Sequence, residues 1–291
     1  MKTPITYYGG KQMLLKHLLP LIPPHQIYCE PFFGGGALFF AKPPSNTEVI
    51  NDINGEVVNF FKVTQTKFSE LEKEIKATLH SRELYKNAMI VYEHPHMFSD
   101  VKRAWALWTA TNQGFASMIG SWGFGKDDSK EASLKTKREN FTHAYAERLK
   151  KVQVENNDAV KVIERCDDKN TFIYADPPYF NSDQGHYKGY TEADYKRLLD
   201  CLVKVKGKFL LSSYPSPILN QYIRKYKWFV QKIEKSVAVT KHTDKKKTEM
   251  IVSNYDPKKA GQMIPIQASK TSRQPSIKEI ESKLKRLKFA A

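Results

Sequence analysis

The residues best able to do chemistry in this sequence stand where a short apolar run ends abruptly. Residues Phe172 to Ala175 are aromatic, β-branched or small, which predicts a buried strand. Pro177 and Pro178 follow closely, and because proline has no N–H to donate to a ladder, the strand must end before them. Asp176 therefore stands at the carboxyl end of a strand, where open α/β sheets hold their ligands.

The turn after this strand offers two hydrogen-bond acceptors and one aromatic face. The prolines stiffen the backbone, so that the Asp176 carboxylate, the Pro177 carbonyl oxygen and the Tyr179 ring are presented together. An amino group on a flat heterocycle needs this set: two acceptors for its two hydrogens, and a ring to stack on. Taken alone, the same residues also fit an ordinary turn at the end of a strand. The predicted elements around these residues must decide between a ligand site and an ordinary turn.

A second group of residues predicts a nucleotide site near the N-terminus. Ile27 to Glu30 has the composition of a strand, Pro31 to Gly36 supplies a glycine turn, and Ala37 to Ala41 continues as an apolar helix. This is the first βα unit of a nucleotide-binding fold, in which glycines let a ligand approach the backbone at the helix N-terminus. The spacing is not G-x-G-x-x-G, which counts against a nicotinamide or flavin cofactor.

Two further carboxylates follow predicted strands. Asp52 ends the stretch that begins at Glu48, at the distance from the glycines where such folds bind ribose hydroxyls. It could equally be the N-cap of the helix predicted from Val57 to Thr64, or serve both roles. Asp158 follows the strand predicted from Val152 to Glu155 and precedes a helix. Both acids are therefore expected at the same edge of the sheet as the Asp-Pro turn.

A stretch of helical periodicity separates the two halves of the predicted sheet. Helix-spaced apolar residues replace the βα alternation over residues 61–150, which predicts an inserted, mostly helical domain. At its centre, residues 112–126 alternate glycines with aromatic side chains. This pattern suits a β-hairpin or loop that inserts into a groove. It suits equally a solvent loop pinned by core aromatics.

The last third of the chain completes the sheet and then changes composition. Phe209 to Ser213 predicts a buried strand, and Trp228 to Thr240 and Thr248 to Tyr255 predict a closing strand pair. The lysines Lys245 to Lys247 between them could face phosphates or form a solvated turn. From residue 257 the composition is that of a basic tail. The predicted domains are 1–60 with 151–256 as one unit, the insertion 61–150, and the tail 257–291.

The composition limits the classes of protein to which this chain can belong. With 41% hydrophobic and 12% aromatic residues the 291-residue chain is globular, and neither a membrane-spanning run nor a signal-peptide core is found. We therefore expect a soluble protein of the cytoplasm without a membrane partner. The formal net charge is +16 and its excess lies beyond residue 60, which suits a polyanionic partner. Three scattered cysteines favour neither a disulfide framework nor a metal site.

In their order and spacing, these motifs resemble those of the Dam-like, alpha-group DNA adenine methyltransferases. The resemblance covers roughly residues 3–255. It implies an α/β fold with a Rossmann-like class I methyltransferase sheet, an inserted target-recognition domain, S-adenosylmethionine as methyl donor, and base flipping. The matching segments are Tyr7-Tyr8-Gly9-Gly10-Lys11, Glu30-Pro31-Phe32-Phe33-Gly34-Gly35-Gly36, Asn51-Asp52-Ile53-Asn54, Asp158, Asp176-Pro177-Pro178-Tyr179 and Lys246-Lys247-Thr248-Glu249.

The resemblance also implies roles for individual residues. Asp52 would bind the ribose hydroxyls of the cofactor and Asp158 its adenine amino group; the full cofactor set is Tyr7, Lys11, Phe32, Gly34, Gly36, Asp52, Asp158 and Asp176. Asp176 and the Pro177 carbonyl would hold the target amino group, and Tyr179 would stack on the flipped base. The expected DNA contacts are Asn112, Phe115, Trp122, Lys126, Lys245, Lys246 and Lys247.

Two positions depart from the pattern of this family. Tyr7 stands where the family often has tryptophan, and residues 112–117 follow the family's usual recognition segment only in part. We therefore infer no DNA recognition sequence.

The expected activity is methyl transfer from S-adenosylmethionine to the 6-amino group of adenine in double-stranded DNA. We expect a monomer or weak dimer in a bacterial or phage-infected cell. Two alternatives remain open at this point. The acceptor could be the 4-amino group of cytosine or an RNA base, although Asp rather than Ser at position 176 favours adenine. The chain could also be a catalytically silent DNA-binding protein, but this interpretation is opposed by the intact Lys11, Asp52, Asp176 and Tyr179.

Overall fold

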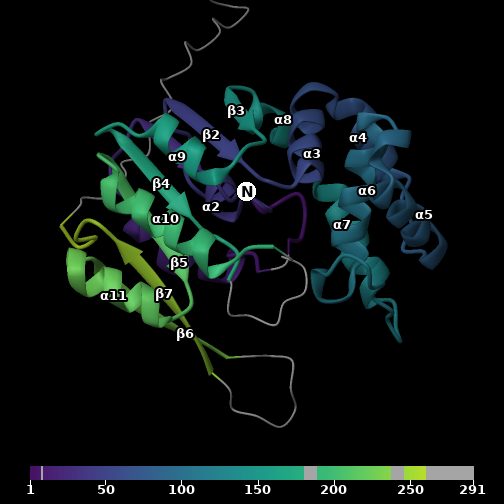
Figure 1. Ribbon diagram of the computed structural model, residues 1–291. Coiled ribbons are helices and arrows are strands. Elements are labelled where there is room, and N and C mark those ends of the chain that lie inside the picture. The colour runs from purple at the N-terminus through teal and green to yellow at the C-terminus, as the bar shows by residue number, and fades with distance from the viewer. Residues whose placement is uncertain (8, 180–188, 237–245, 260–291) are drawn as a thin grey trace, which may run out of the picture.

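In the described part of the chain, a seven-stranded sheet lies beside a separate group of helices (Figure 1). The computed structural model describes residues 1–7, 9–179, 189–236 and 246–259, with the backbone alone at 235–236 and 246–247. In chain order the strands are β1 (Ile27–Glu30), β2 (Thr47–Asn51), β3 (Val152–Glu155), β4 (Thr171–Ala175), β5 (Lys208–Ser213), β6 (Phe229–Ser236) and β7 (Lys246–Ser253).

The strand order confirms the predicted fold class. In space the strands run β3-β2-β1-β4-β5-β7-β6. The first five pair in parallel, whereas β7 lies between β5 and β6 and is antiparallel to both. The chain reverses its direction of travel across the sheet between β1 and β4, and open α/β sheets bind ligands beside such a switch point. This is the Rossmann-like class I methyltransferase sheet expected from the sequence.

Strand register brings the predicted site residues to one edge of the sheet. Cys29 on β1 lies opposite Val49 on β2 and Ile173 on β4. The three strands therefore end level, and the residues that follow them, among them Asp52 and Asp176, leave the same edge.

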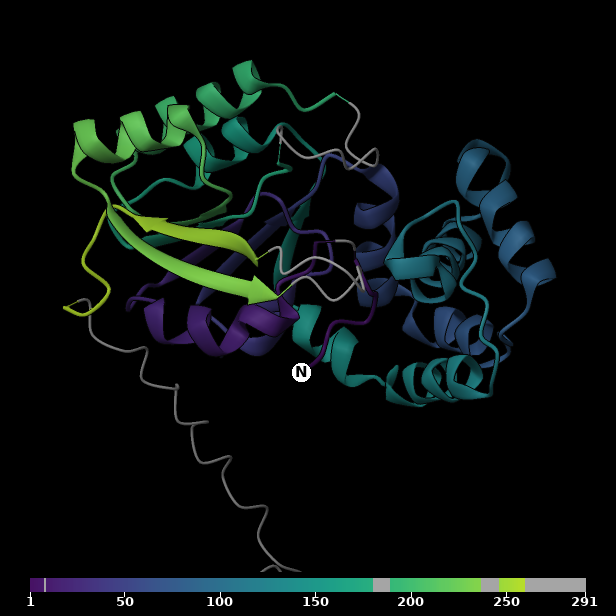
Figure 2. The same ribbon diagram turned by 90° about the horizontal axis from the view of Figure 1, so that it is seen from below.

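Helices cover both faces of the sheet, as the two views show (Figures 1 and 2). Alternate strand residues face opposite layers, so the parallel strands are apolar on both sides. The helices on the first face are η1 (Gln12–Leu14), α1 (Leu15–Leu18), η2 (Leu19–Leu21) and α2 (Ala37–Ala41). The helices on the second face are α9 (Ala159–Cys166), α10 (Glu192–Lys204) and α11 (Pro217–Tyr226). Tyr28 and Phe172 pack in the layer of α1 and α2, whereas Cys29 and Ile173 pack in the layer of α9, α10 and α11.

The chain between β2 and β3 is helical, as the periodicity predicted. The predicted boundary at residue 60 falls inside α3, whose Phe60 and Phe61 belong to the same apolar cluster as Trp105 and Trp108 of the insertion. One continuous core thus runs from the sheet into the insertion. Its helices are α3 (Gly55–Thr66), α4 (Phe68–Lys76), α5 (Arg82–Glu93), η3 (Pro95–Met97), α6 (Asp100–Gln113), η4 (Phe115–Ser117), α7 (Ser129–Asn140) and α8 (Ala144–Leu149).

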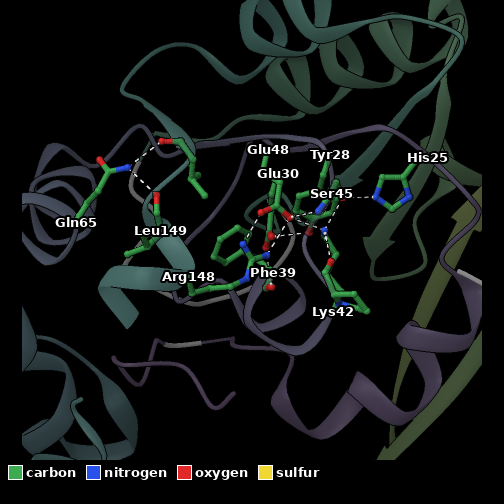
Figure 3. A network of polar contacts seen from close by, with 12 residues as sticks. His25, Tyr28, Glu30, Phe39, Lys42, Ser45, Glu48, Gln65, Arg148 and Leu149 are labelled. Carbon is green, nitrogen blue, oxygen red and sulfur yellow. Dashed lines mark hydrogen bonds and ion pairs between the residues drawn. The ribbon is translucent and has the colours of Figure 1, made fainter. Parts of the chain in front are cut away.

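A buried ionic cluster ties the end of the insertion to the sheet (Figure 3). Glu48 of β2 accepts hydrogen bonds from Lys42 at 2.6 Å and from both terminal nitrogens of Arg148 in α8. Arg148 also donates to the Phe39 carbonyl oxygen of α2 at 3.0 Å. All three charged side chains are nearly inaccessible to solvent. Removing one partner of such a buried ionic group generally lowers the free energy of unfolding by about 3–5 kcal/mol. The cluster therefore holds α8, the last helix of the insertion, firmly against the sheet.

The closing strand pair is confirmed, but its second strand begins earlier than predicted. Lys246 and Lys247 pair with Ser236 and Lys235 across the β6–β7 ladder, so these two lysines are strand residues and the solvated turn predicted for them is wrong at their positions. The polar, glycine-containing stretch Gln184 to Gly189 has a sequence that suits a loop closing over a ligand, but residues 184–188 lie outside the described residues. Lys245 and the tail beyond residue 259 lie outside them as well.

Candidate active site

A cavity of about 590 Å³ opens at the carboxyl ends of the parallel strands. Several parts of the chain enclose it: the N-terminal segment, the glycine turn, the loops after β2 and β3, the Asp176 turn and the first half of α10. The predicted cofactor and catalytic residues all line it, namely Tyr7, Lys11, Phe32, Gly34, Gly36, Asp52, Asp158, Asp176, Pro177 and Tyr179. The structure therefore brings together ten residues that span most of the sequence.

The glycine turn closes tightly around the Asp52 carboxylate. Gly34 and Gly36 have φ of 48° and 67°, a left-handed conformation that glycine adopts readily. The Gly34 N–H donates to Asp52 Oδ2 at 2.8 Å, and the Asn54 N–H donates to Oδ1 at 2.9 Å. Burial raises the pKa of Asp52 to about 6 despite these two hydrogen bonds. The N-cap of α3 is Asn54, which accepts from the Glu56 N–H, so the N-cap role considered for Asp52 is wrong.

Asn51 was not predicted as a site residue, although it positions two of the loops that line the cavity. Its buried amide nitrogen donates to the carbonyl oxygens of Pro31 at 2.9 Å and of Asn157 at 3.0 Å. Its oxygen accepts from the Asn157 N–H at 2.8 Å. One side chain thus joins the ends of β1, β2 and β3. The sequence offers no sign of this, because the partner Asn157 is 106 residues away.

Asp158 lies at the cavity wall as predicted, with an unforeseen partner. It caps α9 by accepting from the Lys161 N–H, and Arg197 of α10 binds it with Nη2 at 2.5 Å and Nη1 at 3.2 Å. Burial works to raise the pKa of Asp158, but the Arg197 hydrogen bonds and charge outweigh it and lower the pKa. The carboxylate is therefore held ionised and in a fixed orientation.

At the other end of the cavity, the Asp176 turn meets Lys11. The Lys11 Nζ lies 2.7 Å from Asp176 Oδ1 and 3.5 Å from Oε1 of Glu249 on β7. Burial works to lower the pKa of Lys11, but the two carboxylates outweigh it and raise the pKa. The Tyr179 hydroxyl donates to Glu249 Oε1 at 2.5 Å, and its ring lies 4.2 Å from the ring of Tyr214.

The ionisation state of Tyr179 follows from these neighbours. Burial, and then the charges of Asp176 and Glu249, hold the pKa of Tyr179 well above its ordinary value. The hydroxyl therefore stays a neutral donor, and the ring keeps the uncharged face that stacking requires.

Two of the predicted DNA contacts are partly buried and have partners within the protein. Asn112 accepts from the Thr6 hydroxyl at 2.7 Å, which ties the end of α6 to the N-terminal segment beside the cavity. Trp122 is half-buried, with the His80 ring stacked at 4.9 Å and the Arg82 guanidinium over the ring at 4.6 Å. Of the alternatives left open for residues 112–126, a β-hairpin or a loop, the structure shows a loop with an isolated bridge between Gly114 and Trp122.

Two other predicted DNA contacts are exposed. Phe115 is 51% exposed and Lys126 is also at the surface. Arg82, which the sequence did not single out, is exposed too and is held by its stacking on Trp122. Lys245 is outside the described residues, and the side chains of Lys246 and Lys247 are not described.

Comparison with known proteins decides the family. The model of the D12 class N6 adenine-specific DNA methyltransferases matches residues 7–251, which include every motif at the cavity. The chain belongs to this family. The D12 class enzyme methylates the 6-amino group of adenine in DNA, with S-adenosylmethionine as donor and the target base flipped out of the helix. The silent-protein, cytosine and RNA alternatives are thereby set aside.

Curated relatives of this D12 enzyme are Type II methyltransferases. M1.LlaDCHI of Lactococcus lactis subsp. cremoris is 27% identical over 270 residues, which cover 85% of this chain and 93% of that protein. M.FokI of Planomicrobium okeanokoites is 24% identical over 282 residues, which cover 88% of this chain and 43% of that protein. Among solved structures, the rRNA methyltransferase aviRa from Streptomyces viridochromogenes is 11% identical with a TM-score of 0.32, covering 86% of each chain. A score this low supports no argument.

The charged groups at the cavity of the D12 enzyme fit the cofactor of the family. S-adenosylmethionine carries a sulfonium and an ammonium, and five acidic side chains line the cavity against two basic ones, Lys11 and Arg197. Both cations are already paired with carboxylates. When bound, the cofactor supplies an electrophilic methyl group. Within the described residues, no three His, Cys, Asp or Glu side chains gather closely enough to hold a metal ion.

None of the described helices of the D12 enzyme combines the length and the apolar composition that a bilayer-spanning segment needs.

Proposed function

We propose that the target adenine binds at the Asp176 turn, with its amino group between the Asp176 carboxylate and the Pro177 carbonyl oxygen and its ring on Tyr179. One observation carries this assignment: these three residues line the same cavity as Asp52 and the glycine turn. A cofactor at the glycine turn and a base at the Asp176 turn would therefore share one enclosed space. Direct transfer requires such proximity.

The two acceptors address the chemical weakness of the adenine amino group. Its nitrogen lone pair is delocalised into the ring, so the group is flat and a poor nucleophile. Hydrogen bonds to the Asp176 carboxylate and the Pro177 carbonyl draw the nitrogen toward tetrahedral geometry and direct its lone pair at the methyl donor. Positioning is the main catalytic contribution. The carboxylate also stabilises the positive charge that develops on nitrogen before a proton leaves.

We propose that the substrate is double-stranded DNA. In a stacked duplex the amino group cannot reach the cavity, and flipping the base costs a few kcal/mol, about 2–4, of unstacking and unpairing. Stacking on an aromatic side chain returns about 1–3 kcal/mol per base. Tyr179 is suited to this role because Tyr214 fixes its ring and Glu249 fixes its hydroxyl.

For DNA contact we propose Phe115, Lys126, Lys245, Lys246 and Lys247, with Asn112 and Trp122 in support. The exposure of Phe115 and Lys126 favours direct contact. The hydrogen bond of Asn112 to Thr6 favours a supporting role, because it links the recognition loop to the N-terminal segment at the cavity.

We propose that the enzyme modifies a short DNA sequence beside a restriction endonuclease, as the Type II names of its relatives suggest. Its DNA lies in the cytoplasm of a bacterial or phage-infected cell, so we place its action there. We expect a monomer or a weak dimer, and light scattering of the protein with and without DNA measures this.

The test of the proposed function is to incubate the protein with S-adenosylmethionine and unmethylated DNA, digest to nucleosides, and identify the methylated base by mass spectrometry. We expect N6-methyladenine from duplex DNA and little from the single strand. Asp176→Ala should abolish the product, because the amino group loses an acceptor and its charge stabilisation, while cofactor binding in calorimetry stays largely intact.

Glu164→Ala is the matched control, because it removes an exposed carboxylate from α9, away from the cavity. It should leave the yield unchanged. Retained turnover in Asp176→Ala would refute the role of Asp176, and a higher yield from single strands would refute the duplex substrate.

A further inference from the structure

Glu249 is a buried carboxylate at the Asp176 turn to which the resemblance assigned no role. It lies on β7, opposite Ile233 of β6, and is only 1% exposed. Its Oε1 accepts the Tyr179 hydroxyl at 2.5 Å and lies 3.5 Å from Lys11 Nζ. Glu249 therefore touches both of the groups that surround the Asp176 carboxylate.

Those two groups have a second acceptor within reach, and it is Asp176 itself. The Tyr179 hydroxyl lies 3.5 Å from Asp176 Oδ1, a full ångström farther than from Glu249. Lys11 Nζ lies 2.7 Å from the same Asp176 oxygen. If Glu249 carried no charge, the Tyr179 hydroxyl would turn to the stronger acceptor, since hydrogen bonds to an ionised carboxylate are about twice as strong as neutral ones.

This reorientation of the Tyr179 hydroxyl would slow methyl transfer in two ways. A carboxylate oxygen that accepts from Tyr179 is less available to the amino group of the target base. The Tyr179 ring, which packs against Tyr214 at 4.2 Å, would also move with its hydroxyl, and the stacking surface would shift. Displacements of about 1 Å at a reacting centre can lower rates about 100-fold.

We propose that Glu249 is a positioning residue that holds the Tyr179 hydroxyl and shares the Lys11 charge, so that Asp176 remains an acceptor for the target amino group. This inference rests on the proposed function, in which Asp176 and Tyr179 hold the adenine. Glu249 itself touches neither substrate, and its effect reaches the reaction through Tyr179 and Lys11.

The first test compares Glu249→Gln with the parent enzyme in single-turnover methylation at saturating S-adenosylmethionine and duplex DNA. Glutamine keeps the shape of the side chain and removes the charge. The rate should fall about 10- to 100-fold, while the dissociation constant for S-adenosylmethionine changes less than about threefold. Glu249→Asp, which keeps the charge, should recover part of the rate.

The decisive variant is the double change Glu249→Gln with Tyr179→Phe. Phenylalanine keeps the stacking ring and removes the hydroxyl that would compete for Asp176. The double variant should therefore methylate faster than Glu249→Gln alone, and a double-mutant cycle should give strong coupling between the two sites. Additive losses would overturn the proposal, because they would mean that Glu249 does not act through the hydroxyl.

A spectroscopic readout separates positioning from mere structure. With 2-aminopurine at the target position, Glu249→Gln should still raise the fluorescence on flipping but hold the base less rigidly, with a lower anisotropy than the parent. Loss of cooperative thermal unfolding or of cofactor binding would make Glu249 a structural residue and overturn the proposal, as would a rate within twofold of the parent. Glu164→Gln is the control and should match the parent.

The outcomes also separate this inference from the proposed function. If Asp176→Ala retains turnover, the proposed function fails and the inference fails with it. If Asp176→Ala abolishes turnover and Glu249→Gln does not slow it, the inference alone fails.

Discussion

At the residue scale, Glu30 is a buried carboxyl group whose protonation affects the stability of the protein. It ends β1, lines the cavity and is 2% exposed. Burial raises its pKa to about 8, although the Tyr28 hydroxyl donates to its Oε2 at 2.6 Å and opposes the shift. Without cofactor, Glu30 is therefore protonated over much of the neutral range, and the folded state holds a proton that the unfolded chain releases.

The pKa of Glu30 makes stability depend on pH. The folded pKa of Glu30 is above the unfolded value of 4.5. The contribution of Glu30 to the free energy of unfolding is therefore fully present below about pH 4.5. It declines as the pH rises above this value and is lost once the pH has passed about 8. Glu30→Gln removes the titrating group. We therefore expect the free energy of unfolding of this variant to improve relative to the parent between pH 5 and pH 8, by about 1 kcal/mol or more. Urea unfolding of both proteins without cofactor, at pH 5 and at pH 8, measures this difference in the free energy of unfolding.

A constant difference between the two proteins over this range would contradict the raised pKa. Asp52, with a pKa raised to about 6, is present in both proteins and cancels in the comparison. Glu164→Gln again controls for the loss of an exposed carboxylate.

At the element scale, the junction between the glycine turn and α2 has no room for a side chain. Gly36 is the N-cap of α2 with φ of 67°. A Cβ there would meet the Phe33 ring at 2.4 Å. That ring is packed edge-on against Phe61 at 4.7 Å and Phe39 at 5.4 Å, so it has little room to give way.

Gly36→Ala should therefore disturb both stability and cofactor binding. We expect a loss of about 2 kcal/mol or more in unfolding free energy, from left-handed strain and overpacking together. The affinity for S-adenosylmethionine should fall at least about tenfold, because the strained turn lines the cavity. Chemical unfolding and calorimetry measure the two effects.

Gly55→Ala is the matched control for this prediction. Its Cβ would find only Asn156 Oδ1, at an ordinary 3.7 Å, and its position in the first turn of α3 should leave stability equal or slightly higher. Equal effects of the two changes would contradict the steric account of the turn.

At the scale of the whole molecule, charge is distributed unevenly along the chain. The first 60 residues are balanced, whereas residues 257–291 carry nine basic side chains against two acidic ones. Among the charged residues that line the cavity, five are acidic and two are basic. Attraction to the DNA backbone must therefore come from the later parts of the chain, through release of counterions from phosphates.

Removal of residues 257–291 tests the contribution of the tail. We expect a lower affinity for duplex DNA and a shallower dependence of log K on log salt, by about 0.9 for each DNA phosphate that the shortened protein no longer neutralises. Turnover at saturating DNA should change little, because the cavity is untouched. Binding measured from 50 to 200 mM salt gives the slope.

A charge-only variant, Lys283→Gln with Lys285→Gln and Lys288→Gln, separates charge from chain length. It should show part of the same decrease in affinity. An unchanged affinity in both proteins would mean that the charge of the tail is incidental.

The order of motifs along the chain was enough to determine the fold class, the family and ten of the residues that line the cavity. Each of these depends on short-range patterns: an apolar run ended by Pro177, glycines before a helix, an acid after a strand. Such patterns specify the ends of strands, and parallel strands bring their ends to one edge. The structure confirms that Asp52, Asp158 and Asp176 meet there.

Only the tertiary structure decided how these residues are held. Glu249 reaches Tyr179 across 70 positions and Asn51 reaches Asn157 across 106, because β7 enters the sheet beside β5 and β3 pairs with β2. The same holds for Trp122, whose burial between His80 and Arg82 depends on the packing of α5 against the loop after α6. Local composition does not encode contacts between distant segments; the order of strands and the packing of helices create them.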